Sequence, residues 1–284
     1  MELLKLISYG SKQLKEGKIL SHRIDSELLM SKVLKKAREE ILINLDQKIS
    51  TQKVNNENVS VFKKYLNRRS KNEPIAYILN EKEFWCKKFE INKHTLIPRP
   101  ETELLVEELI KIFDKKKISI LDIGTGSGCI ILSLLSSLEK SLGIGVDISK
   151  GAILIAKKNA KKLKLLERVK FLNKPFEGLF NKKFDLIVSN PPYIDKKDMK
   201  NLSEDIKKYE PRIALDGGND GLDLIKKVIY KSNEILKING LLALEIGNEQ
   251  IKKVSKILID NNFRVKKIIK DYKLNVRCVI ASYR

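Results

Sequence analysis

Hydrophobic side chains follow two different patterns along the chain, and the change between them comes near residue 118. In the first part, Leu28-Leu29 and Val33-Leu34 recur at the three- and four-residue spacing of a helix that buries one face. Pro74 is expected to end this helical segment. The pattern predicts a small all-helical domain over residues 1–75.

A short alternating segment follows. Phe84, Cys86, Phe89 and Ile91 lie at positions that fit a pair of strands. Residues 76–100 are therefore predicted to form a β-hairpin connector.

Helical and strand patterns alternate in the rest of the chain. The first helix is predicted from Glu101 to Phe113, with Glu101 and Glu103 favourably placed in its first turn. Further helices are predicted over residues 148–164, 222–236 and 249–261, and strands over residues 118–123, 142–147, 169–172, 184–189, 241–246, 263–270 and 276–283.

This alternation predicts an α/β fold with a mostly parallel, doubly wound, Rossmann-like sheet over residues 101–284. Only residues 271–275 separate the last two of the seven strands. That segment is too short for a crossover helix, so the final hairpin is predicted to be antiparallel.

The strongly basic composition raises the question of whether the protein binds nucleic acid. The formal net charge is +21, and most of the 57 basic residues are Lys spread along the whole chain. A lysine-rich composition accounts for this charge, because Arg is preferred for bidentate contacts with phosphates and bases. Attraction to RNA-rich assemblies stays open as the alternative, since net charge affects association without defining a site.

Few residues are suited to disulfides, metals or membranes. The three Cys are far apart and the two His have no ligand-like neighbours in sequence, so we predict neither disulfide nor metal site. The N-terminus lacks a secretion signal, and Asp122 with three glycines interrupts the most apolar stretch, residues 118–138. We expect a soluble, cytoplasmic protein with no membrane partner.

A glycine-rich segment follows the first strand of the predicted sheet. It reads Asp122-Ile-Gly-Thr-Gly-Ser-Gly128, with Gly124, Thr125, Gly126, Ser127 and Gly128 forming the loop. Glycines let the backbone turn sharply and approach a ligand closely. The spacing is G-x-G-x-G and not the G-x-G-x-x-G of dinucleotide sites. It suits S-adenosylmethionine, which carries no phosphate.

Asp147 ends the second strand of the sheet. A carboxylate at this place can accept hydrogen bonds from both hydroxyls of a ribose, as in nucleotide-binding relatives of the fold. The alternative is a negative charge that stabilises the start of the helix after Ser149. Its coincidence with the glycine loop favours the ribose role.

The tetrapeptide Asn190-Pro191-Pro192-Tyr193 follows an apolar strand and is predicted to share one rim of the sheet with the glycine loop. The Asn190 side-chain oxygen and the Pro191 carbonyl can accept both N–H bonds of one NH2 group. Tyr193 offers a flat face for a planar group. Two such acceptors would stabilise the charge that develops on a weakly nucleophilic nitrogen. The alternative is a rigid turn with a capping Asn.

The chain resembles the release-factor glutamine N5-methyltransferases, the HemK or PrmC family, over essentially its whole length. Four motifs carry the resemblance: Leu96-Ile-Pro-Arg-Pro-Glu-Thr-Glu103, Asp122–Gly128, Asn190-Pro-Pro-Tyr-Ile194 and Glu210-Pro-Arg-Ile-Ala-Leu-Asp-Gly-Gly-Asn-Asp-Gly221. The tetrapeptide is shared with adenine-N6 methyltransferases. Its combination with Arg-Pro-Glu-Thr-Glu is highly specific.

The resemblance implies a class I methyltransferase fold, S-adenosyl-L-methionine as methyl donor, and cofactor contacts at Gly124–Gly128, Asp147 and Asn190. It implies glutamine binding and catalysis at Asn190–Tyr193. The substrate it implies is the glutamine of the Gly-Gly-Gln tip of class I peptide chain release factors, whose methylation modulates translation termination. Where the family usually has an acid and then an aromatic residue near adenine, this chain has Lys174-Pro175-Phe176. The acid is missing, and the Pro175 ring remains to pack on adenine.

Two other functions compete with this one. An adenine-N6 methyltransferase acting on DNA or RNA fits the tetrapeptide and the charge, but the chain has no added target-recognition domain and no Arg-rich cluster. No specific nucleic-acid partner is therefore expected. A methyl-donor-binding module without activity would leave the tetrapeptide unexplained.

Overall fold

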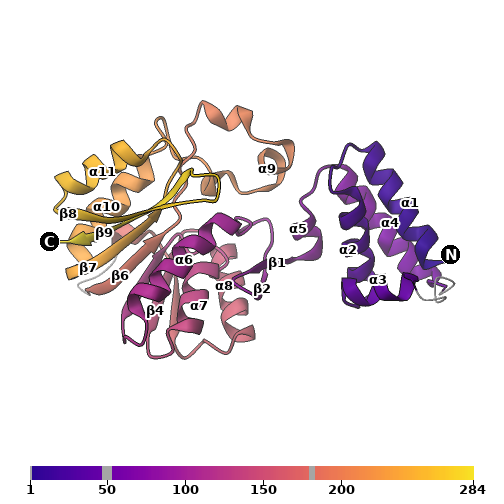
Figure 1. The fold of residues 1–284 in the computed structure, drawn as a ribbon, viewed down its shortest axis with the longest axis horizontal. Helices are drawn as coiled ribbons and strands as arrows, with labels where there is room; N and C mark the ends of the chain where they lie inside the picture. Colours follow the sequence, from indigo (N-terminus) through magenta and orange to yellow (C-terminus); the bar gives the residue numbers. More distant parts are fainter. Residues whose placement is uncertain (1, 47–52, 179–182) are drawn as a thin grey trace. The chain divides into compact units, whose positions relative to one another are not determined.

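The computed structural model describes residues 2–46, 53–178 and 183–284, and the chain divides into two compact units (Figure 1). Unit 1 comprises Met1–Asn80 together with Ser203–Tyr209. Unit 2 comprises Glu81–Leu202 and Glu210–Arg284.

Unit 1 is helical. Its helices are α1 (Leu3–Glu16), α2 (His22–Leu34), α3 (Arg38–Asp46), α4 (Asn56–Ser70), α5 (Ile75–Leu79) and α9 (Glu204–Tyr209). Helices α1, α2 and α4 bury one apolar core that includes Leu6, Leu29 and Phe62. They approach closely at Gly10, where a Cβ atom would lie 2.5 Å from Ser26 Oγ and 2.8 Å from the Phe62 ring. The predicted helical N-terminal region is confirmed.

The prediction that Pro74 ends the helical segment is wrong. Pro74 is the N-cap of a further short helix, α5, whose Ile78 is buried in the same core. Proline is favourable at a helix start because its φ is already fixed and its missing N–H would have no partner there.

Unit 2 is built on a seven-stranded sheet. Its strands are β3 (Ser119–Ile123), β4 (Leu142–Asp147), β5 (Val169–Asn173), β6 (Phe184–Ser189), β7 (Leu236–Glu245), β8 (Phe263–Lys270) and β9 (Val276–Tyr283). The strand order is β5-β4-β3-β6-β7-β9-β8. The first five strands along this order are parallel, while β9 is antiparallel to both β7 and β8. The predicted class I sheet and its antiparallel final hairpin are confirmed.

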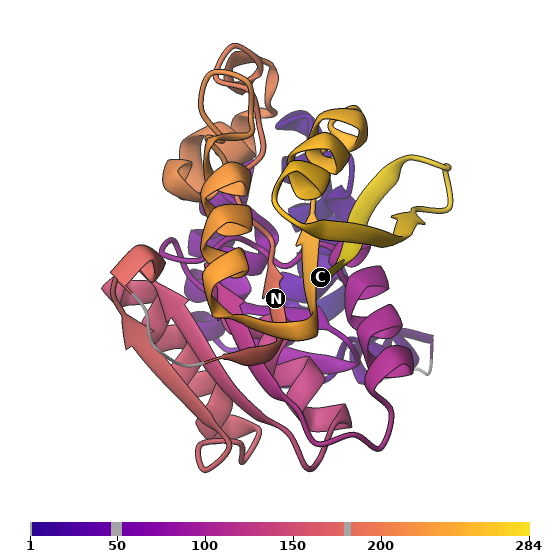
Figure 2. The ribbon, with the colours of Figure 1, turned by 90° about the vertical axis from the view of Figure 1, so that its left-hand side faces the viewer.

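Helices cover both faces of the sheet (Figure 2). One face carries α6 (Pro100–Phe113), α7 (Cys129–Ser137) and α8 (Lys150–Lys162), and the other carries α10 (Asp223–Ile235) and α11 (Ile251–Asp260). Within the described part of the chain, the 3-10 turns η2 (Phe176–Gly178), η3 (Asp198–Asn201) and η4 (Arg212–Ala214) lie in the connections.

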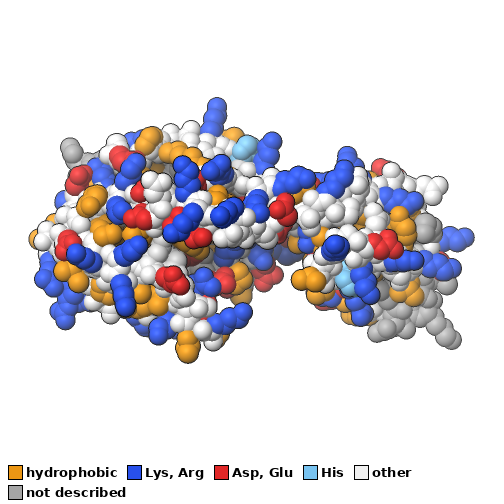
Figure 3. Space-filling view, turned by 90° about the horizontal axis from the view of Figure 1, so that it is seen from above, with side chains coloured by type: hydrophobic (Ala, Val, Ile, Leu, Met, Phe, Trp, Pro, Cys, Tyr) orange, Lys and Arg blue, Asp and Glu red, His pale blue; other side chains and the backbone are white. Residues whose placement is uncertain are grey.

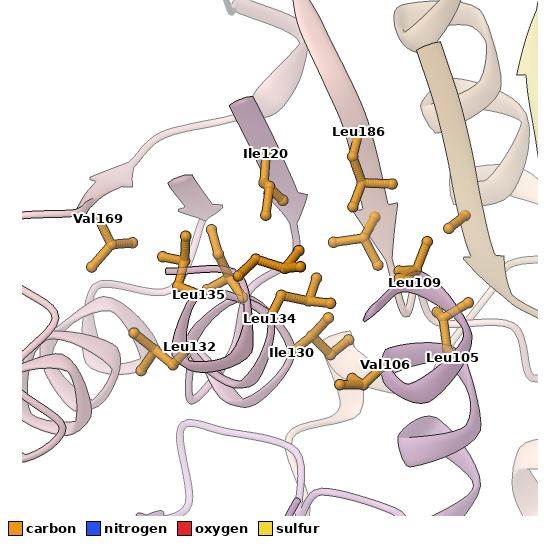
Figure 4. Close-up of a cluster of buried hydrophobic side chains, with 14 of the residues drawn as sticks. Leu105, Val106, Leu109, Ile120, Ile130, Leu132, Leu134, Leu135, Val169 and Leu186 are labelled. Atoms are coloured by element: carbon orange, nitrogen blue, oxygen red, sulfur yellow. The ribbon is translucent and has the colours of Figure 1, made fainter. Parts of the chain in front are cut away.

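Alternation along the central strands divides the core into two layers. Ile120 and Leu186 point toward α6 and α7, where Leu109 and Leu134 pack against them (Figure 4). Leu121 points to the opposite face and its separate apolar cluster. Strands buried on both faces read as nearly continuous apolar runs, which is why their positions were predictable.

The segment before α6 forms a two-stranded hairpin of β1 (Glu81–Phe84) and β2 (Lys87–Glu90). Phe84 and Phe89 are buried edge to face, with ring centroids 6.1 Å apart. The prediction that Cys86 takes part in the strand alternation is wrong. Trp85 and Cys86 form a tight turn with φ of 50° and 52°, and Cys86 is exposed.

No helix within the described residues is long and apolar enough to span a membrane.

Candidate active site

The glycine loop connects the end of β3 to the start of α7. Gly124, Gly126 and Gly128 all have positive φ, at 71°, 55° and 79°. The N–H groups of Gly124 and Thr125 both donate to the Val146 carbonyl at 2.9 Å, which fixes the loop to the end of β4. Residues with a Cβ rarely adopt these φ values, so the shape of the loop requires glycine at these three positions.

Gly124 and Gly128 face different surroundings. A Cβ atom on Gly124 would meet nothing within 4 Å, so its backbone borders open space. A Cβ on Gly128 would lie 3.0 Å from Leu132 and 3.3 Å from Ala156, so this glycine allows α7 and α8 to pack closely. Only the first of these surroundings suits direct contact with a ligand.

Asp147, at the end of β4, joins the loop to the next helix. One carboxylate oxygen accepts from Gly126 N–H at 2.9 Å, and the other accepts from Ser149 N–H at 2.8 Å. Partial burial raises the pKa of Asp147, and these two hydrogen bonds oppose the rise. The Asp147 side chain also borders the cavity described below. Asp147 therefore stabilises the start of α8, as the alternative role predicts, and its side chain can still contact a ligand in the cavity.

A second acid, Asp122, lies beneath the loop and is completely buried. Its Oδ2 accepts from Thr125 Oγ1 at 2.7 Å, while Oδ1 has no hydrogen-bond partner among the described residues. Burial raises the Asp122 pKa to about 7, and the nearby charge of Asp147 adds to the rise. The sequence pattern predicts no role for Asp122 beyond opening the motif.

The predicted tetrapeptide begins directly after β6, beside the glycine loop. Ser189 Oγ donates to the Ile123 carbonyl at 2.7 Å and ties the ends of β6 and β3 together. Asn190 is half-buried, and its Nδ2 donates to Thr102 Oγ1 at 3.4 Å. The Tyr193 hydroxyl donates to Glu245 Oε1 at 3.3 Å.

Thr102 and Glu245 are site residues that were not predicted from the sequence. Thr102 is in the first turn of α6 and Glu245 is the last residue of β7, and both are almost fully buried. Burial raises the Glu245 pKa, while hydrogen bonds from Thr102 and Tyr193 lower it. Two sequence features could have indicated these residues. Thr102 lies inside the Arg-Pro-Glu-Thr-Glu motif, and Glu245 is an acid at the end of a buried strand.

The motif that starts at Glu210 forms a wall beside the tetrapeptide. The buried Glu210 carboxylate accepts from Ile97 N–H at 3.2 Å and from Arg99 Nη2 at 2.5 Å. Farther along, Gly217 N–H donates to the Ile194 carbonyl at 2.9 Å. A Cβ on Gly217 would come within 2.8 Å of the Pro192 carbonyl, so glycine is needed for this close approach.

These segments of unit 2 enclose a cavity of about 480 Å³. Of the residues predicted from sequence, Gly124, Thr125, Gly126, Ser127, Asp147, Pro175, Asn190 and Pro192 line it. Gly128, Pro191 and Tyr193 are not among its lining residues. Residues without a predicted role that line the cavity include Arg99, Thr102, Ile148, Phe176, Glu177 and Ile213. Glu177 places an acid on the wall that also holds Pro175.

Comparison with known proteins agrees with this arrangement of motifs. The profile described as "PrmC N-terminal domain" matches residues 5–79, and that described as "Methyltransferase small domain" matches residues 100–276. The "Release factor glutamine methyltransferase" of Fusobacterium nucleatum subsp. nucleatum is 38% identical over 99% of this chain and 79% of its own. The protein of the same name from Clostridium acetobutylicum is 40% identical over 90% of both chains. This chain belongs to the release factor glutamine methyltransferase family.

Solved structures support the fold of this family member. The catalytic domain of hMettl16, in complex with a MAT2A 3′UTR hairpin, matches with a TM-score of 0.56 and 18% identity, over 69% of this chain and 74% of the other. A methyltransferase from Pyrococcus furiosus matches with a TM-score of 0.51 and 18% identity, over 68% and 87%. Both likenesses concern the fold alone.

Proposed function

We propose that this chain transfers a methyl group from S-adenosyl-L-methionine to the side-chain amide nitrogen, N5, of the glutamine in the Gly-Gly-Gln motif of class I peptide chain release factors. One observation carries the proposal: Asn190 lines the same cavity as Gly124, Gly126 and Asp147. A cofactor held by the glycine loop and a planar amide held by Asn190 would therefore meet in one cavity.

The cavity fits the cofactor in three respects. The backbone at Gly124 borders open space, as close approach of a ligand requires. Asp147 provides carboxylate oxygens for hydroxyl groups, since an ionised carboxylate can accept up to about four hydrogen bonds and two are used by the backbone. Pro175 and the buried Phe176 supply apolar surface for a flat ring. When bound, S-adenosylmethionine supplies a methyl group made electrophilic by a positively charged sulfur.

Asn190 and Pro191 would bind the substrate amide. The amide nitrogen is a weak nucleophile because its lone pair is delocalised, and it becomes positively charged as it gains the methyl group. Two oxygen acceptors, Asn190 Oδ1 and the Pro191 carbonyl, stabilise that charge and orient the nitrogen. Pro192 lines the same cavity, whereas Pro191 is not among the lining residues. Tyr193 is not among the cavity-lining residues, and its hydroxyl donates to Glu245, which fixes the ring next to the two prolines.

We propose three functional parts along the chain. Residues 1–75 form the helical domain that recognises the release factor, residues 76–100 form the hairpin connector, and residues 101–284 carry out the transfer. The division of the chain into compact units after Asn80 supports a separate recognition domain. If this domain binds the body of the release factor, whole release factor should be methylated far more efficiently than a short peptide bearing the Gly-Gly-Gln tip.

On the one face that is visible, the mixed surface charge favours a protein substrate over a nucleic acid. Lys and Arg side chains are spread over the visible face with Asp and Glu between them (Figure 3). A specific nucleic-acid site would gather basic residues into one patch or stripe. We propose that the protein acts in the cytoplasm, with no specific nucleic-acid or membrane partner.

Transfer of tritium from labelled S-adenosylmethionine tests the function. The wild-type protein is incubated with purified class I release factor, with DNA, with RNA and with ribosomal protein. The proposal expects labelling of the release factor alone. Labelling of adenine in DNA or RNA, with release factor unlabelled, would replace it by the adenine-N6 alternative.

A further inference from the structure

Three side chains form a chain of hydrogen bonds that ends at the cavity. Glu245, at the end of β7, accepts from Thr102 Oγ1 through Oε2 at 2.5 Å. Thr102 Oγ1 in turn accepts from Asn190 Nδ2 at 3.4 Å. Thr102 and Asn190 both line the cavity, and Glu245 lies behind them with 2% of its surface exposed.

The direction of these hydrogen bonds follows from the number of protons available. A threonine hydroxyl has one proton and two lone pairs. Glu245 Oε2 accepts the hydrogen bond from Thr102, so the single Thr102 proton points to Glu245. Thr102 therefore has only lone pairs to offer Asn190. The NH2 side of the Asn190 amide faces Thr102, and its oxygen is left for the cavity.

The second oxygen of Glu245 is also committed, because it accepts from the Tyr193 hydroxyl at 3.3 Å. Glu245 thus binds the residues on both sides of the two prolines, one directly and one through Thr102. Without the carboxylate, the Thr102 proton would be free to turn to Asn190. The amide would then reverse and present its own NH2 group to the NH2 group of the substrate.

We infer that Glu245 and Thr102 are positioning residues that set the direction of the Asn190 amide, so that its oxygen and not its nitrogen faces the substrate. The inference rests on the proposed function, in which Asn190 binds the glutamine amide. Neither residue needs to touch the substrate. They act through Asn190, and that dependence can be measured.

The first test removes the Thr102 hydroxyl at nearly constant shape. Single-turnover methyl transfer to release factor is measured for the wild type, Thr102→Val and Thr102→Ser. We expect Thr102→Val to slow transfer about tenfold or more, since it loses the group that orients an acceptor. Thr102→Ser keeps the hydroxyl and should recover most of the rate. Cofactor affinity, measured by calorimetry, should stay within about twofold, because the residues that hold the cofactor are unchanged.

Ser232→Ala is the matched control. Ser232 is a buried hydroxyl in α10 with no hydrogen-bond partner among the described residues, and it does not line the cavity. Its loss should leave the transfer rate unchanged. Equal slowing by Ser232→Ala and Thr102→Val would mean that removal of any buried hydroxyl has this effect, and would overturn the inference.

A double-mutant cycle gives the decisive result. If Thr102 acts only through Asn190, Thr102→Val should slow an Asn190→Ala enzyme by less than about twofold, because residues that act as a unit are not additive. Multiplying losses would overturn the inference, as would a Thr102→Val enzyme that keeps more than half of its rate.

Glu245→Gln provides a second route if Thr102→Val does not fold. A Gln side chain offers one NH2 group and one oxygen to the two hydroxyls, so the Thr102 proton is no longer fixed. We expect slower transfer that is again non-additive with Asn190→Ala, and additive losses would overturn the inference. The wild-type arm tests the proposed function separately. If the wild type labels adenine instead, the proposed glutamine methylation is wrong. The same double-mutant cycle is then measured with adenine as the methyl acceptor.

Discussion

The Asp147 carboxylate accepts hydrogen bonds from Gly126 N–H at 2.9 Å and from Ser149 N–H at 2.8 Å. One side chain at the end of β4 therefore fixes both the middle of the glycine loop and the start of α8. The same side chain borders the cavity. In the proposed complex it shapes the cofactor site and also contributes to binding.

Asp147→Asn should weaken cofactor binding by about tenfold or more. The substitution removes the charge and points an NH2 group at one backbone N–H, and hydrogen bonds to charged groups contribute roughly 1.5–3 kcal/mol. Calorimetric titration with S-adenosylmethionine measures the effect. Asp185→Asn is the matched control, because Asp185 binds Ser119 and Lys237 at the other end of β6, outside the cavity lining. Unchanged affinity in folded Asp147→Asn would limit Asp147 to holding the loop and the helix start.

Gly124→Ala and Gly128→Ala should separate binding from stability. Both positions have positive φ, so each alanine costs about 1–2 kcal/mol of backbone strain. At Gly128 the added methyl group also presses on Leu132 and Ala156, which adds to the loss. We expect the larger fall in the free energy of unfolding for Gly128→Ala. The larger fall in cofactor affinity should belong to Gly124→Ala, whose methyl group enters open space. The reverse order in calorimetry and chemical denaturation would contradict this assignment.

The sequence was sufficient to predict the sheet and the loops at the carboxyl ends of its strands. Strands buried on both faces, such as β3 and β6, appear as apolar runs, and a glycine loop needs residues without a Cβ. Asp147 and Asn190 were found because Asp147 is the last residue of a strand and Asn190 directly follows one. The buried strands, the glycine loop and the polar residues at strand ends each depend on neighbouring residues in the sequence, so a local pattern is enough to predict them.

Side-chain networks between distant segments were not predictable in this way. The hydrogen bond from Thr102 to Glu245 joins residues 143 positions apart, and no local pattern indicates it. Tyr193 was predicted as a flat face for the substrate, but its hydroxyl binds Glu245 and it is not among the cavity-lining residues. Cys86 fitted the strand alternation, yet a tight turn with positive φ was preferred.

Asp122 should make stability depend on pH. Burial raises its pKa in the folded protein to about 7 from a usual value of 3.8. The folded state therefore holds a proton that the unfolded chain has lost, and stability falls as pH rises through that interval. From pH 5 to pH 7 the fall should be about 2 kcal/mol, since one pKa unit corresponds to roughly 1.4 kcal/mol.

Asp122→Asn should remove this part of the pH dependence, because an amide does not titrate. Denaturant unfolding of both proteins at pH 5 and pH 7 measures it. The variant should gain stability relative to the wild type as pH rises. A constant difference between the two proteins would mean that the Asp122 carboxyl titrates normally.

Asn190→Ala should slow methyl transfer by about 10²–10³ with little change in cofactor affinity. Loss of one preorganised hydrogen-bonding group that stabilises developing charge typically has this effect. Asn261→Ala, which removes a side chain at the end of α11, is the control and should keep the wild-type rate. If Asn190→Ala keeps more than about half of the activity with cofactor binding intact, the two-acceptor mechanism is wrong.

The central claim is that one glutamine nitrogen receives the methyl group. Purified class I release factor is incubated with the protein and S-adenosylmethionine, digested and analysed by tandem mass spectrometry. We expect the mass of one methyl group on the glutamine of the Gly-Gly-Gln tip, and none when that glutamine is replaced by alanine. An unmodified tip, in a reaction where the same enzyme methylates adenine in DNA or RNA, would contradict the claim.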